Sequence, residues 1–193
     1  MLPRNEKSIA ELSPGALRVY SGFGQLASQG FAFYRVVPAQ SLTVAEYRIQ
    51  DEFGREIGRY VGTGKKSAIL KYGDKTANLY IQGAVFGGSI YAGNVAGKSN
   101  NSIVIRDQDR ILAEAERTRI FPASCYRLVC EGAVFEVAAG GLWPTRLGSF
   151  SKEGKQVGAF RRPAISSRNV VAAFDPHLSD ESKVFLAGMA LLG

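Results

Sequence analysis

The sequence predicts a single, mainly β domain in which short strands surround a buried hydrophobic C-terminal helix. Two observations lead to this prediction. Short apolar segments separated by Gly, Asn and Asp turns run along most of the 193-residue chain, and the last segment is apolar on every side. Short strands at this spacing indicate an all-β sandwich or barrel rather than alternating strand and helix units.

The strands are predicted from the alternation of apolar and polar residues. In "EYRIQ" (46–50), Tyr47 and Ile49 face one way and the residues between them face the other, which is the two-residue period of a half-buried strand. The segment "NLYIQG" (78–83) repeats this pattern. Further strand-like segments lie at 31–37, 56–61, 67–72, 84–92, 102–106, 125–131, 133–138, 145–151, 155–161 and 168–174.

A weak internal repeat supports hairpins. Three stretches share one plan of strand, polar turn and second strand beginning with an aliphatic residue: 47–61, 103–117 and 147–161. Glycine ends the turns Asp51–Gly54 and Lys152–Gly154, and it accepts a positive φ without steric cost. The middle copy has Arg110 instead, and its "ILAEAERTR" also fits a short helix. Because this copy follows the same hairpin plan, we favour a strand.

The last segment, "SDESKVFLAGMALLG", predicts a helix over 180–192. Ser179 or Asp180 is a suitable N-cap, and Asp180 and Glu181 suit the positive end of the helix dipole. Nine apolar or glycine residues then follow without interruption, from Val184 to Leu192. A helix that is apolar all round is buried on every face, and nine residues are too few to cross a bilayer. We therefore expect this helix to fill the middle of a large barrel.

The first 30 residues fit neither the strand nor the helix period. We expect "SPGALRVYSGFGQLASQG" to be loop, with at most one strand. The single domain, 1–193, is accordingly divided into a poorly defined N-terminal segment (1–30), barrel strands (31–175) and a central helix (180–192).

The hairpins "YRIQDEFGREIG" and "FSKEGKQVGAF", with the closing segment "VVAAFDPHLSDESKVFLAGMALL", resemble the tubby C-terminal-like superfamily, which includes the phospholipid scramblase-like and LURP-one-related proteins. The resemblance covers about residues 31–192. It implies a closed antiparallel barrel of about twelve strands around a buried hydrophobic C-terminal α-helix. It also implies a module that binds anionic phospholipid or phosphoinositide headgroups. The basic residues that tubby proteins use have no clear counterpart here, so none is carried over.

Composition indicates what kind of partner the protein has and in which compartment it is found. Lysine and arginine give a net charge of +7 and a pI near 9.5, which suits an anionic partner but also plain solubility. Cys125 and Cys130 lie five residues apart on one predicted strand, so they point to opposite faces and do not bridge. No signal peptide is visible at the N-terminus. We expect a cytoplasmic protein, peripheral to a membrane if lipid is its ligand.

No catalytic, metal or cofactor site is predicted. "AGNVAGKS" (92–99), with Lys98 and Ser99, loosely matches a phosphate-binding loop, but the segment after it is β-like and the loop's strand–helix context is missing. We favour a hairpin loop there. His177 is the only histidine and no nucleophile elbow accompanies it. The pair Asp107 and Asp109 has too few oxygens for a calcium loop.

These observations predict a non-enzymatic binding module for anionic phospholipid or another phosphorylated ligand. The candidate headgroup contacts are Lys65, Lys66, Lys71, Arg161 and Arg162. The alternative is a protein-interaction or structural domain with an unknown partner and no small ligand. Nucleic-acid binding is supported by charge alone, and we do not predict it.

Overall fold

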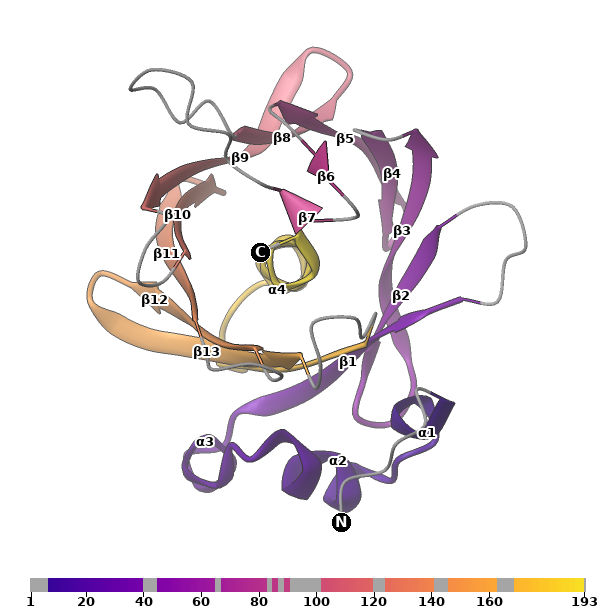
Figure 1. Ribbon diagram of the computed structural model, residues 1–193, viewed down its shortest axis with the longest axis vertical. Helices are drawn as coiled ribbons and strands as arrows, with labels where there is room; N and C mark the ends of the chain where they lie inside the picture. Colours follow the sequence, from indigo (N-terminus) through magenta and orange to yellow (C-terminus); the bar gives the residue numbers. More distant parts are fainter. Residues whose placement is uncertain are drawn as a thin grey trace.

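The computed structural model describes residues 7–39, 45–64, 67–82, 85–86, 89–90, 102–119, 124–140, 146–162 and 169–192. Within these residues, twelve strands close into one barrel. Figure 1 looks along the barrel and shows the C-terminal helix, α4 (Asp180–Leu192), end-on inside the ring of strands. The predicted fold class, a closed antiparallel barrel with a C-terminal helix packed against it, is confirmed.

The barrel is an antiparallel meander. Strands adjacent in the ring are also consecutive in the chain, except that β5 pairs with β8 and β1 closes the ring against β14. Such pairs need only short hairpin links. The strands are β1 (Ala32–Pro38), β2 (Glu46–Asp51), β3 (Glu56–Gly64), β4 (Ser67–Tyr72), β5 (Lys75–Gln82), β8 (Ser102–Asp107), β9 (Arg110–Arg119), β10 (Ser124–Cys130), β11 (Ala133–Gly140), β12 (Arg146–Lys152), β13 (Lys155–Arg162) and β14 (Val170–Phe174).

The predicted repeat and its ambiguous middle copy are settled by this order. The three copies form the hairpins β2–β3, β8–β9 and β12–β13, and the segment after Arg110 is a strand. The predicted strand 84–92 is different. It holds β6 (Val85–Phe86) and β7 (Ser89–Ile90), which pair with each other in a separate two-stranded sheet. Two glycines stand between them in the sequence, and glycine weakens a continuous strand.

Helix α4 is apolar on all sides because the barrel wall surrounds it. Leu186 and Ala187 are fully buried. The helix begins as predicted, since Ser179 Oγ accepts a hydrogen bond of 3.0 Å from the backbone N–H of Ser182. The wall approaches the helix closely at Gly188, where an added Cβ would overlap the Tyr60 hydroxyl oxygen.

The N-terminal segment is helical, and the prediction of a loop is wrong. Its helices are α1 (Lys7–Ala10), α2 (Pro14–Ser21) and α3 (Gly24–Ser28). The backbone N–H of Ala16 donates to Ser13 Oγ, Pro14 occupies the first turn of α2, and Gly22 ends that helix with a φ of 74°. Helices this short are marginal alone and show too few turns for their period to be read. Packing on the barrel stabilises them.

These helices cover the outer side of β13, β14 and β1, as Figure 1 shows below the ring of strands. We call this side the covered face. Its outward side chains and the helices form a second apolar cluster, separate from the core around α4. The buried members of this cluster are Ile9, Leu17, Leu26, Phe33, Val37, Ala159, Val171 and Ala173.

A buried arginine also joins the helices to the barrel. Arg35 is 3 % exposed, and its Nη1 donates to the carbonyls of Ile9 (3.1 Å) and Ala10 (2.6 Å). Its Nη2 donates to the carbonyl of Glu52 (2.9 Å). One guanidinium thus ties α1 to β1 and to the turn after β2, because its planar fork can reach several acceptors at once.

Candidate functional site

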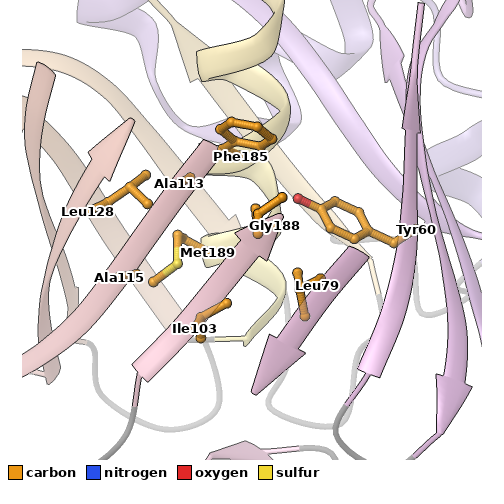
Figure 2. Close-up of a pocket in the computed structure, with 10 residues that line it drawn as sticks. Tyr60, Leu79, Ile103, Ala113, Ala115, Leu128, Phe185, Gly188 and Met189 are labelled. Carbon is orange, nitrogen blue, oxygen red and sulfur yellow. The ribbon is translucent and has the colours of Figure 1, made fainter. Parts of the chain in front are cut away.

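Among the described residues, the space beside α4 inside the barrel is too small for an organic ligand. A void of about 10 Å³ lies between α4 and the barrel wall. Figure 2 shows the side chains that line it, which are mainly apolar, such as Leu79, Phe185 and Met189. The polar atom there, the Tyr60 hydroxyl, already donates to the carbonyl of Val184 at 3.0 Å. A void of this size holds at most about one water molecule. This void therefore has no room for an organic ligand.

The polar groups at the start of α4 form hydrogen bonds with one another, and the Cys130 thiol beside them is not a reactive nucleophile. Glu131 Oε2 accepts hydrogen bonds from Ser182 Oγ (2.7 Å) and from Ser179 Oγ. Cys130 Sγ lies 3.8 Å from the Ser182 hydroxyl oxygen. Burial raises the pKa of the Cys130 thiol to about 11, so the thiol stays protonated at neutral pH, and a thiol is a far weaker nucleophile than a thiolate.

Two of the sequence-predicted headgroup contacts are used by the fold itself. Arg162 is 7 % exposed, and its Nη2 donates to the carbonyls of Ala190 (3.0 Å) and Leu191, at the negative end of the α4 dipole. Arg161 Nη1 donates to the carbonyl of Tyr20 at 3.1 Å on the covered face. The chain's own carbonyls therefore accept hydrogen bonds from both cations.

The predicted lysines are divided between described and undescribed residues. Lys71 is exposed on β4, where it stands opposite Arg59 of β3. Arg59 is paired with Glu46 (2.8 Å) and Glu56 (2.9 Å), so acidic residues offset the positive charge of this face. Lys65, Lys66, Lys98 and Ser99 lie outside the described residues. The structure does not bring Lys71, Arg161 and Arg162 together.

A different group of cations lies on the outer side of β9, β10, β11 and β12, which we call the open face. A depression of about 460 Å³ lies there, within the range of volumes typical of small-molecule sites. Its lining residues are Thr118, Arg119, Cys125, Tyr126, Arg127, Val134, Glu136, Val137, Ala138 and Ser151.

The depression follows from the sizes of neighbouring outward side chains. Ala138 faces outward between Cys125 of β10 and Ser149 of β12, and Ser151 stands opposite Glu136. These small residues leave a low floor, while the long side chains of Arg119 and Arg127 rise beside it. A β-bulge between β9 and β10 places Arg119 opposite Cys125, and bulges commonly re-aim side chains next to functional sites.

The charged groups around the depression form no ion pairs with one another among the described residues. Arg127 stands opposite Glu136 on one side and Glu116 on the other. Opposite charges at such positions usually pair. Within the part of the chain that the structure describes, however, neither Arg127 nor Glu136 forms an ion pair. Arg119 Nη2 donates to Cys125 Sγ at 3.0 Å.

This arrangement can hold a small oxyanion. A guanidinium presents several N–H donors in one plane and matches phosphate or carboxylate oxygens. Two guanidiniums, with the Thr118 and Ser151 hydroxyls on the same lining, supply enough donors for a phosphate group. The described residues contain no cluster of His, Cys, Asp and Glu suited to a metal ion, and no helix among them is long and apolar enough to span a bilayer.

The pairing of Arg127 with Glu136 could have been predicted from the sequence. A two-residue turn at Glu131–Gly132, with φ values of 49° and 73°, pairs Arg127 with Glu136 once the strands 125–131 and 133–138 are joined as a hairpin. The β-bulge that turns Arg119 toward Cys125 has no signal in the sequence, because the chain on either side of it is an ordinary strand.

Comparisons with known proteins add no relative. No family model, no curated protein and no solved structure matches this chain. The resemblance to the tubby C-terminal-like superfamily rests on the hairpin segments and the closing helix, and it stays a prediction.

Proposed function

We propose that the protein is a non-catalytic binding module for a phosphate-bearing ligand, such as the headgroup of an anionic phospholipid, and that the ligand binds in the depression on the open face. The single observation that supports this proposal is that Arg119 and Arg127, whose guanidiniums form no ion pair among the described residues, line one depression of about 460 Å³. The void of about 10 Å³ beside α4 supports it further, because that void is too small for such a ligand.

The open face suits this role better than the face around Lys71. Lys71 stands on a surface where Arg59 is already paired with two glutamates, whereas Arg119 and Arg127 line one depression. Arginine also binds phosphate through two parallel hydrogen bonds, so that the direction of the bonds as well as the charge selects the ligand. The predicted contacts Lys65, Lys66 and Lys71 remain candidates for a second, longer-range attraction to an anionic surface.

Vesicle flotation tests the proposal. We expect the protein to float with anionic phospholipid vesicles at low salt, and less at high salt. The double variant Arg119→Glu and Arg127→Glu should lose flotation. The matched control, Arg106→Glu with Lys155→Glu, makes the same charge change at exposed positions outside the depression and should retain most of it. Loss in the control alone would place the site elsewhere and overturn the proposal.

A second candidate function is a docking surface for another protein. Val129 and Val134 stand opposite each other on the open face and are 41 % and 38 % exposed. Exposed apolar residues next to arginine occur in protein interfaces. Substitution of both valines by serine, with unchanged vesicle binding and loss of a purified protein partner, would favour this second function.

A further inference from the structure

Three charged side chains of both signs line the same depression. Arg119 and Arg127 are cationic and Glu136 is anionic. Arg127 and Glu136 occupy directly opposed positions on β10 and β11, where side chains begin about 5 Å apart. Neither forms an ion pair within the described residues. Both charges are therefore presented to whatever occupies the depression.

We infer that the ligand of the open face is zwitterionic, a phosphate ester that carries a primary amine. Its phosphate binds Arg119 and Arg127, and its ammonium group donates to the carboxylate of Glu136. This inference rests on the proposed function, since it names the class of ligand for that same depression.

The carboxylates argue against a polyanionic ligand. Glu136 lines the depression, and Glu116 stands on the other side of Arg127. A multiply phosphorylated ligand would bring negative charge against Glu136 inside the depression and toward Glu116 beyond it, and like charges repel. A ligand with one phosphate and one ammonium group meets an opposite charge at each end instead.

The lining also distinguishes a primary amine from a quaternary one. Quaternary ammonium groups bind in cages of aromatic rings. Tyr126 is the aromatic residue on the described lining, and it is 2 % exposed, facing the barrel interior. A carboxylate such as that of Glu136 accepts hydrogen bonds, which a primary ammonium donates and a quaternary ammonium does not.

Isothermal titration calorimetry tests this inference with O-phosphoethanolamine, phosphocholine, inorganic phosphate and inositol trisphosphate as probes. We expect wild-type protein to bind O-phosphoethanolamine about fivefold more tightly than phosphocholine or inorganic phosphate, as one part-exposed charge contact gives. Glu136→Gln should remove this preference and leave phosphate binding in place. Glu114→Gln, at an exposed outward position of β9 outside the depression, should keep it.

The outcomes separate the inference from the function on which it rests. Equal affinity for inorganic phosphate and O-phosphoethanolamine, or tighter binding of inositol trisphosphate, would overturn the inference and leave the proposed function standing. Failure of every phosphate compound to bind would overturn both. Stronger flotation with anionic vesicles that contain phosphatidylethanolamine than with those that contain phosphatidylcholine identifies a lipid headgroup as the source. Binding of free O-phosphoethanolamine without such flotation identifies a soluble ester.

Discussion

On the covered face, the outward positions of β1 and β14 hold Phe33, Val37 and Val171, which are buried beneath the N-terminal helices. On the open face, the outward positions of β10 and β11 hold Arg127 and Glu136, which are exposed. The inner side of both regions packs on the same core around α4. The outward residues therefore match what lies over each part of the wall. They are apolar beneath the layer of helices and charged where the wall faces solvent or a ligand.

The largest difference between the two faces should appear when an outward residue is truncated. Phe33 is fully buried, so we expect Phe33→Ala to lower the free energy of unfolding by about 3–5 kcal/mol. Val134→Ala on the open face should change it by no more than about 0.5 kcal/mol. Urea denaturation of both variants measures the two values. Similar losses at the two positions would contradict the assignment of one face as covered.

Outward arginines should show a smaller contrast of the same kind. Arg35→Met leaves the carbonyls of Ile9, Ala10 and Glu52 without their donor, and the hydrogen bonds to Ile9 and Glu52 are buried. We expect a loss of about 1–3 kcal/mol in the free energy of unfolding. Arg127→Met should have almost no effect on stability, because that guanidinium makes no ion pair among the described residues. A strongly destabilised Arg127 variant would show that this arginine serves the fold.

The pKa of Cys130 allows a further test on the inner side of the open-face strands. Its pKa is about 11 in the folded protein, above the ordinary 9.0, because burial disfavours the thiolate. The protonated, buried thiol therefore contributes to the free energy of unfolding. This contribution is fully present below pH 9 and is lost as the pH rises through 11. We expect the stability difference between wild type and Cys130→Ala to be constant below pH 9 and to shrink above it. A constant difference across the whole range would show that the thiol is not buried in the folded state.

The two thiols give the least perturbing test. Cys125 is partly exposed in the depression, whereas Cys130 is buried against α4. We expect a thiol reagent such as DTNB to modify one cysteine per native chain and two after unfolding. Native Cys125→Ser should then react with none. Reaction of both thiols in the native protein would mean that β10 does not present its alternate residues to opposite sides.

The sequence predicted the barrel well because its signals are local. Alternation, hairpin turns and a helix that is apolar all round each appear within about fifteen residues, as in "SDESKVFLAGMALLG". The covered face was missed because α1, α2 and α3 are too short to show a helical period and are stabilised by packing on Phe33 and Val171. Contacts of that kind join distant residues and leave no local pattern.

The candidate site was predicted less well than the fold. Net charge indicated an anionic ligand, but charge alone cannot separate Arg162, which caps α4, from Arg127, which faces outward. Alternation within 125–131 places Arg127 and Leu128 on opposite sides of the wall, as observed. The pairing of Arg119 with Cys125 depends on a bulge, and only the three-dimensional structure reveals it.

The most direct test of the central claim is to map a ligand onto the two faces. We would record ¹H–¹⁵N spectra of uniformly labelled protein during titration with O-phosphoethanolamine. The amide signals of Thr118, Arg119, Arg127 and Glu136 should shift together and saturate, while those of Phe33, Val37 and Val171 stay in place. Shifts confined to the covered face, or to the strand that carries Lys71, would contradict the claim that the open face is the binding site.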